Sequence, residues 1–252
     1  MTVKNSARKL LNVLASQLSK RVSYEIFREP IVDQIQDTRS LAALDIRKFA
    51  QIVAGLEAGE FYCEHLYNVP FFQNYVDHVA AMAGRAASFG NGLILEFGVA
   101  SGVTLRAIAG TIGREAVGFD SFKGLPTDWR EGVAAGAFAC SPPELPLNAS
   151  LKIGMIEDTL PRFLAEHPTS EINFIHVDTD LYEPAKQILE LCEPRLQKAI
   201  IVFDELINFP GWRDHEWKAL SEFMTRNSGT FDFEYVGLGG TAAVSLKVTR
   251  KN

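Results

Sequence analysis

The sequence has few cysteines, no excess of basic charge and no long apolar run. Its three cysteines, at positions 63, 140 and 192, show no CxxC spacing, which argues against a disulfide framework or a cysteine-rich zinc site. The net charge of −6 argues against a nucleic-acid partner, because phosphate binding needs a concentrated basic face. No stretch approaches the roughly 20 apolar residues that cross a bilayer, and the N-terminus shows no signal-peptide pattern. We therefore expect a cytoplasmic protein without membrane or nucleic-acid partners.

What remains is the composition of a folded α/β protein. With 252 residues, 47% of them apolar, the chain can bury a large core and suits one α/β domain with an appendage. Apolar residues recur at helical spacing in residues 6–22, and further helices are expected at about 40–57 and 71–88. We interpret residues 1–88 as an N-terminal helical extension that packs on the main domain, covers the substrate or joins copies in a homo-oligomer. Residues 89–252 would form the main domain.

From residue 91 onward, strand-like and helix-like segments alternate. Strands are expected at 93–97, 116–120, 150–154, 172–178 and 198–204, and helices at 102–112, 157–166, 182–193 and 212–226. This succession predicts parallel strands with helices on both faces. Two final strand-like runs, 231–236 and 242–248, flank a glycine-rich turn and predict an antiparallel hairpin. The expected fold is α/β, with a mostly parallel seven-stranded sheet.

The residues that carry chemistry begin at Glu96-Phe-Gly-Val-Ala-Ser-Gly102, directly after the first apolar run. Its two glycines let backbone amides approach a ligand that any Cβ would block, and the next helix offers unpaired N–H groups. Acidic residues recur at later strand ends, at Asp120, Asp178 and Asp204. In an open parallel sheet these ends share one edge, where such folds bind ligands. We expect an adenosine-containing cofactor there, with Asp120 accepting both ribose hydroxyls. The alternative role of Asp120 is to cap a helix or to stabilise the loop.

A long aperiodic segment, residues 121–149, separates the second and third of these strands. It contains four prolines, with Trp129 and Phe138 embedded among them. A loop of that length inside a compact domain is more often functional or mobile than idle. We expect it to border the active site.

Several motifs in this order resemble a class I S-adenosylmethionine-dependent methyltransferase: Glu96-x-Gly-x-x-x-Gly102, Gly118-Phe-Asp-Ser-Phe122, His176-Val-Asp-Thr-Asp180, Val202-Phe-Asp-Glu205 and the final hairpin. More narrowly, Phe119–Pro126 with Trp129, Glu157–Pro161 and Asp178–Tyr182 are similar to the macrocin-type O-methyltransferase family, over about residues 60–248. The resemblance implies a Rossmann-like fold and S-adenosylmethionine as cofactor. It also implies methyl transfer to a hydroxyl of a small molecule, such as a sugar or a glycosylated natural product.

The resemblance assigns a set of residues to the cofactor: Glu96, Phe97, Gly98, Ser101, Gly102, Asp120, Ser121, Phe122, Met155, Ile156, Asp158 and Asp178. Met155, Ile156 and Asp158 would lie near the adenine, as an apolar wall with one carboxylate. A purely structural role is equally open for some of these acids. Glu96 could simply cap loop amides, and the acids at 157 and 158 could simply begin a helix.

The expected catalytic group consists of Asp178, Asp204 and Glu205. Oxygen-only ligands suit Mg²⁺, which would lower the pKa of the acceptor hydroxyl. The macrocin-type enzymes usually carry aspartate where this chain has Glu205, which reaches one methylene further. The alternative is therefore a metal-free site in which Asp178 or a histidine is the base. His215 is the best such histidine, although a surface or capping role is equally open for it. His176 is expected in the core. Asp180 is expected to cap the helix near 182, with an inward turn toward the site as its alternative.

Two other functions are compatible with parts of this pattern. A nicotinamide-dependent oxidoreductase would also use a strand-turn-helix and an acid such as Asp120, but the loop lacks the G-x-G-x-x-G spacing and the hairpin is unexpected. A non-catalytic cofactor-binding protein is the third hypothesis, and Glu205 is the residue that keeps it open.

Overall fold

A computed structural model describes residues 46–251, and the chain from residue 50 onward forms one compact unit. The predicted helix 6–22 and the start of the helix predicted at 40–57 lie outside the described residues. Helix α3 (Ile46–Phe61) runs past its predicted end and continues into the π-helical turn η2 (Tyr62–Leu66). No helix within the described range combines the length and apolarity needed to span a membrane.

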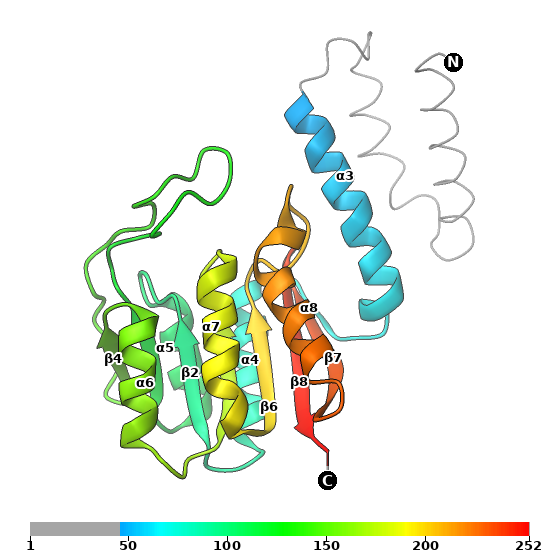
Figure 1. The fold of residues 1–252 in the computed structure, drawn as a ribbon. Coiled ribbons are helices and arrows are strands. Elements are labelled where there is room, and N and C mark those ends of the chain that lie inside the picture. Colours follow the sequence, from blue (N-terminus) through cyan, green and yellow to red (C-terminus); the bar gives the residue numbers. More distant parts are fainter. Residues whose placement is uncertain (1–45, 252) are drawn as a thin grey trace, which may run out of the picture. The chain divides into compact units, whose positions relative to one another are not determined.

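A single mostly parallel sheet organises this unit (Figure 1). Its strands are β1 (Phe71–Phe72), β2 (Leu93–Phe97), β3 (Ala116–Asp120), β4 (Ala149–Ile153), β5 (Ile172–Val177), β6 (Leu196–Phe203), β7 (Phe231–Gly239) and β8 (Ala243–Arg250). The spatial order is β1-β7-β8-β6-β5-β2-β3-β4. The β8 strand is antiparallel to β6 and β7, and the remaining pairs are parallel. The predicted parallel sheet with a C-terminal hairpin is confirmed.

The sheet has eight strands because β1 forms where the sequence predicts the start of a helix at residue 71. Its two residues pair with the edge of β7, and the backbone N–H of Leu238 donates to Pro70 O at 3.0 Å. Helix α4 (Tyr75–Ala87) begins later, where the side chain of Asn74 accepts a hydrogen bond from the backbone N–H of Val76 at 2.8 Å. The cap therefore sets the helix start.

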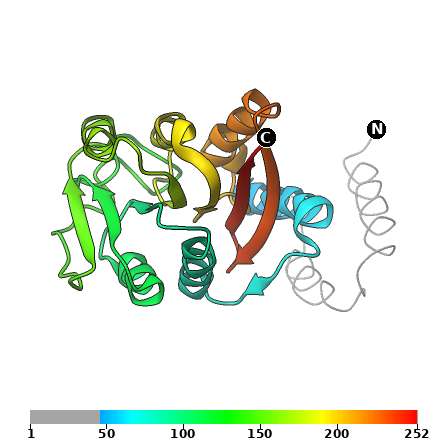
Figure 2. The same cartoon turned by 90° about the horizontal axis from the view of Figure 1, so that it is seen from below.

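Helices cover both faces of the sheet. Helices α4 and α5 (Val103–Ile112) lie on one face, and α6 (Ile156–Glu166), α7 (Tyr182–Cys192) and α8 (Glu216–Arg226) lie on the other (Figure 2). The short 3-10 helices η3 (Glu193–Arg195) and η4 (Trp212–Asp214) flank β6 and its following loop. The helix predicted at 212–226 is thus divided, with η4 before α8.

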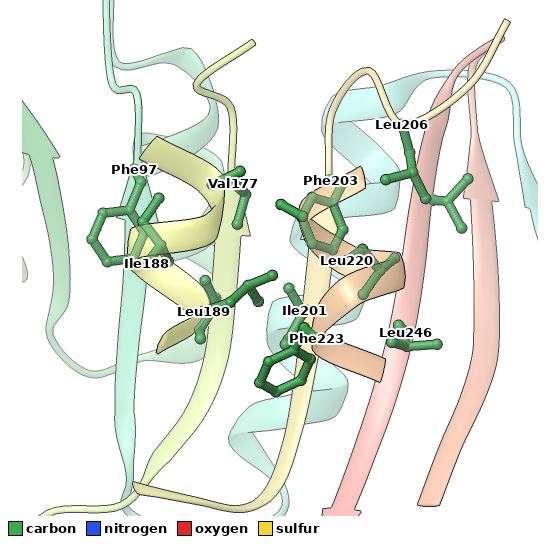
Figure 3. Close-up of a cluster of buried hydrophobic side chains, with 14 of the residues drawn as sticks. Phe97, Val177, Ile188, Leu189, Ile201, Phe203, Leu206, Leu220, Phe223 and Leu246 are labelled. Atoms are coloured by element: carbon green, nitrogen blue, oxygen red, sulfur yellow. The ribbon is translucent and has the colours of Figure 1, made fainter. Parts of the chain in front are cut away.

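Two hydrophobic clusters join these layers and fix the strand ends. On the α7 and α8 face, Phe97, Val177 and Ile201 from three strands pack beneath Ile188 and Leu220 (Figure 3). Each such buried side chain contributes about 1.5–3 kcal/mol relative to an exposed one. The other face has a second cluster, which includes Val79, Leu105, Ile108, Phe174 and Val202. Strands packed on both sides give the loops at their carboxyl ends a rigid base.

Candidate active site

A cavity of about 1010 Å³ lies at the carboxyl ends of the parallel strands. Its walls come from the glycine turn after β2, the ends of β3 to β6, the 121–148 loop, the start of α7 and the segment before α8. The acids at the strand ends, Asp120, Asp178 and Asp204, all line it. The long loop predicted to border the site does so through residues such as Trp129, which is 8% exposed.

The glycine turn after β2 is tightly enclosed by the neighbouring strand. Gly98 has a φ of +86°, and a Cβ at this position would lie 1.7 Å from the carbonyl oxygen of Asp178. The backbone N–H of Asp178 in turn donates to Phe97 O at 2.9 Å. Only glycine fits this close approach, and it leaves the backbone of the turn exposed to the cavity.

Asp120 holds the same turn from the end of β3. Its Oδ2 accepts hydrogen bonds from the backbone N–H groups of Val99 and Ala100, both at 2.8 Å, and its Oδ1 accepts one from Phe122 at 2.7 Å. A carboxylate has about four acceptor sites, so about one remains, on Oδ1. The prediction that Asp120 accepts both ribose hydroxyls stays a prediction, and the structure shows that the same carboxylate also holds the glycine turn.

The predicted cofactor residues divide into two groups. Those that line the cavity are Gly98, Asp120, Ser121, Met155, Ile156 and Asp178, and those that do not are Glu96, Phe97, Ser101, Gly102, Phe122 and Asp158. Asp158 lies in the first turn of α6, where a negative charge favours the helix. Phe97 is in the core, where its ring stacks on Phe119 with centroids 4.8 Å apart.

Glu96 is fully buried behind the glycine turn. It accepts a hydrogen bond from the hydroxyl of Thr104, and its Oε1 lies 2.9 Å from Nδ1 of His176. His176 is also fully buried, as expected for a core histidine. Glu96 therefore ties β2 to α5 and β5 and does not line the cavity, and its role toward the cofactor stays a prediction.

Asp178, Asp180 and Asp204 form an acidic cluster in the cavity. Burial, Asp204 and Asp180 raise the pKa of Asp178 well above its usual range. Burial also raises the pKa of Asp204, and nearby His176 lowers it by a smaller amount. The pKa of Asp180 is raised to about 7 by burial and by the charges of Glu205 and Asp204. A carboxyl with that pKa changes its charge near neutral pH.

The prediction that Asp180 caps the following helix is wrong. Leu181 is the N-cap residue of α7, and no side chain caps it. Asp180 instead adopts a left-handed conformation, with φ of 61°, at the cavity wall. Aspartate tolerates this region better than most residues. A D-x-x-E-P sequence before a helix gives no sign of this turn, so the sequence favours a cap and offers the inward turn of Asp180 only as the alternative.

Glu205 forms an ion pair with Arg130 from the long loop. Arg130 Nη1 lies 3.1 Å from Glu205 Oε2, with about a third of each side chain exposed. The guanidinium also lies over the rings of Trp129, 3.8 Å from its centroid, and Phe209, at 5.2 Å. No sequence signal links Arg130 to Glu205, since 75 positions separate them.

This ion pair does not fit the magnesium site predicted from Asp178, Asp204 and Glu205. All three residues line the cavity, but a guanidinium already neutralises the third carboxylate. Within residues 46–251, no three or more histidine, cysteine, aspartate or glutamate side chains are grouped so that they could hold a metal ion. The donor set therefore corrects the prediction of a metal site.

His215 lines the cavity as the sequence predicts for a candidate base. It lies just before α8, its side chain makes no capping hydrogen bond, and its ring lies near Phe209 and Trp129, with centroids 5.9 and 6.4 Å away. Burial lowers its pKa. His215 is thus neutral at neutral pH and can accept a proton or a hydrogen bond.

Comparisons with known proteins agree with this geometry. Residues 95–206 match a family model described as a methyltransferase domain. The chain is similar to the crystal structure of CalS11, a calicheamicin methyltransferase, with 28% identity and a TM-score of 0.57 over 68% of this chain and 77% of that one. An apo structure of CalS11, described as a TDP-rhamnose 3'-O-methyltransferase, matches with 28% identity, a TM-score of 0.51 and coverage of 68% and 78%. The O-methyltransferase NovP shares the fold, with 19% identity, a TM-score of 0.52 and coverage of 70% and 80%. No curated protein sequence matches the chain.

The glycine turn, the strand order and these similarities define a class I S-adenosylmethionine-dependent methyltransferase. Within that class, the chain has the fold of the O-methyltransferases. The oxidoreductase alternative is therefore set aside. Gly98 and the free acceptor site of Asp120 fit S-adenosylmethionine, because they offer open backbone and one carboxylate acceptor at the cavity wall.

Proposed function

We propose that this enzyme transfers a methyl group from S-adenosylmethionine to a hydroxyl of a small molecule, such as a sugar or a glycosylated natural product. The observation that carries the proposal is the acidic cluster of Asp178, Asp180 and Asp204 in the same cavity as the glycine turn. At about 1010 Å³ the cavity is at the upper end of ligand pockets, which leaves room for an acceptor beside a cofactor.

In the proposed mechanism, S-adenosylmethionine supplies an electrophilic methyl group on a positively charged sulfur. The residues that would hold it are Gly98, Asp120, Ser121, Met155 and Ile156, from the ends of three neighbouring strands. Their placement would fix the direction of the methyl group, which in-line displacement requires.

Asp180 is the proposed general base. Its carboxylate would accept the proton of the acceptor hydroxyl as the oxygen bonds to the methyl carbon and the methyl–sulfur bond breaks, so that the products are a methyl ether and S-adenosylhomocysteine. A base works best when its pKa lies near the operating pH, and burial places that of Asp180 at about 7. Asp178 is one of the two bases that the sequence offers for a metal-free site. Its pKa is raised by burial and by both neighbouring aspartates, and it would instead face the cofactor's positive charge. No step uses a metal ion, because Glu205 is paired with Arg130.

The charge of the cavity favours an uncharged or basic acceptor. Among the described residues, the lining acids are Asp120, Glu157, Asp178, Asp180, Glu183, Glu190, Asp204, Glu205 and Asp214, against the cations Arg130 and Lys186. Even with Glu205 paired to Arg130 and Glu190 paired to Arg226, the remaining acids outnumber the cations, so a diphosphate would meet repulsion there. Although CalS11 is described as acting on TDP-rhamnose, we propose a glycoside without phosphate for this chain.

An acceptor panel tests the proposed function. Purified enzyme with S-adenosylmethionine should release S-adenosylhomocysteine when given neutral or amine-bearing glycosides, and mass spectrometry should show a product heavier by one methylene. Nucleoside diphosphate sugars of matched hydroxyl pattern should react more slowly, because of the acidic walls. Faster turnover of the diphosphate sugars would contradict the proposed acceptor class, and no turnover of any hydroxyl compound would contradict the function.

Asp120→Ala should weaken the binding of S-adenosylhomocysteine about 10- to 100-fold. The substitution removes the remaining acceptor for the ribose and also releases the three backbone N–H groups that shape the turn. Isothermal titration calorimetry measures the affinity, and Asp204→Asn is the matched control. Because Asp204 is not among the residues proposed to hold the cofactor, its amide variant should bind S-adenosylhomocysteine nearly as the wild type does. Equal losses in both variants would contradict the assignment of Asp120 to the cofactor.

A further inference from the structure

Glu205 has the length needed to reach the long loop. It follows Asp204 at the carboxyl end of β6, and its carboxylate meets the Arg130 guanidinium at 3.1 Å. An aspartate at this position would end one methylene closer to the sheet, where it could face Asp204 but fall short of Arg130. The length of the glutamate side chain therefore allows the ion pair with Arg130.

Arg130 is held from several sides. Its guanidinium lies 3.8 Å from the centroid of Trp129 and 5.2 Å from that of Phe209, which belongs to the segment after β6. The backbone N–H of Val133 donates to Arg130 O at 2.8 Å, and that of Trp129 donates to Val133 O at 3.0 Å. A tight turn thus presents the guanidinium to Glu205. A divalent ion at Glu205 would have to displace a stacked, hydrogen-bonded cation.

The buried ring of Trp129 extends the same contact. It packs edge-on against Phe209, with centroids 5.6 Å apart, and lies 6.4 Å from the ring of His215. The loop is therefore attached to β6 and the segment after it by the Arg130–Glu205 ion pair and by the contacts of the Trp129 ring with Phe209 and His215. This attachment forms the wall of the cavity next to Asp180 and Asp204.

We infer that Glu205 is a positioning residue that holds Arg130, and through it the 121–148 loop, against the segment after β6, in place of the divalent ion expected from the sequence. The inference rests on the proposed function, since the loop is one wall of the proposed active site. In this arrangement methyl transfer does not require a divalent cation.

Hydrogen exchange on the full chain tests the attachment. Glu205→Gln and Arg130→Gln should each speed amide exchange in the peptide covering residues 122–140 by about two- to fivefold, the range for a partly exposed ion pair. The double variant should exchange no faster than either single variant, because the pair is already broken. Glu205→Asp should match Glu205→Gln, because it keeps the charge but loses the reach. If Glu205→Gln fails to fold, the exchange of Glu205→Asp provides the same test.

The matched control is Glu190→Gln, which breaks a different ion pair of the cavity wall, with Arg226 at 2.8 Å. It should leave exchange in residues 122–140 unchanged. Additive effects in the Glu205 and Arg130 variants, or equal effects in the control, would overturn the inference.

Titration calorimetry with Mg²⁺ alone tests whether the site binds a divalent ion. The wild-type protein should show no saturable Mg²⁺ binding at millimolar concentrations, and its thermal midpoint should not change with Mg²⁺. Saturable binding that Glu205→Gln abolishes and Arg130→Gln retains would overturn the inference. Neither readout depends on turnover, so an absence of methyl transfer would contradict the proposed function and leave this test intact.

Discussion

Asp180→Asn should lower kcat about 10²- to 10⁴-fold, the usual contribution of a general base. Asparagine keeps the size of the side chain and suits the left-handed backbone at φ 61°, so the turn should survive. What it removes is the acceptor for the hydroxyl proton. The affinity for S-adenosylhomocysteine should change little, since Asp180 is not among the residues proposed to hold the cofactor.

The pH profile supplies the sharper readout of this prediction. A base must be deprotonated, and the pKa of Asp180 is about 7, so kcat/KM of the wild type should fall as the pH drops below about 7 and level off above it. Asp180→Asn should lose this limb of the profile. Asp204→Asn should move the limb to lower pH, because the Asp204 charge helps to raise the Asp180 pKa.

Asp214→Asn is a matched control, as an aspartate of the same cavity wall without a proposed role. Its kcat should stay within about twofold of the wild type, as for most surface substitutions. If Asp180→Asn kept the wild-type rate and pH profile, another group would be the base. His215 would then be the first candidate, because burial keeps it neutral and able to accept a proton.

Local patterns predicted most of the fold. Alternating strand and helix segments, and the turn before the last strand, depend on residues close in sequence, so their order could be predicted. β1 could not, because it has two residues and forms only through its pairing with β7. The late start of α8 likewise depends on the turn at η4 rather than on apolar spacing.

The site was predictable where backbone geometry determines a residue's role. Gly98 and Asp120 lie at strand ends, and the parallel sheet brings such ends to one edge. Glu96 was harder, because β2 is buried on both faces and its sequence does not show which way a side chain points. The pairing of Glu205 with Arg130 joins a strand end to an aperiodic loop, and no local pattern predicts such a contact.

Gly98→Ala tests whether the glycine turn depends on the missing Cβ. The added carbon would lie 1.7 Å from the Asp178 carbonyl oxygen, and both atoms belong to strand ends that are fixed by the core. The φ of +86° adds strain for any residue with a Cβ. The ends of β2 and β5 would have to separate, and we expect a loss of about 3 kcal/mol or more in the free energy of unfolding. Urea denaturation measures this loss.

The cofactor site should fail together with the turn. Separating these strand ends moves Asp178 and the loop that Asp120 holds, so binding of S-adenosylhomocysteine should fall below detection even in protein that still folds. Gly113→Ala is the control, because Gly113 also has a positive φ, of 67°, but open space where its Cβ would lie. This variant has the backbone strain without the clash, so it should lower the free energy of unfolding by only about 1 kcal/mol and leave the affinity for S-adenosylhomocysteine unchanged. Similar losses in both variants would show that backbone conformation, rather than the close approach of β5, makes glycine necessary at position 98.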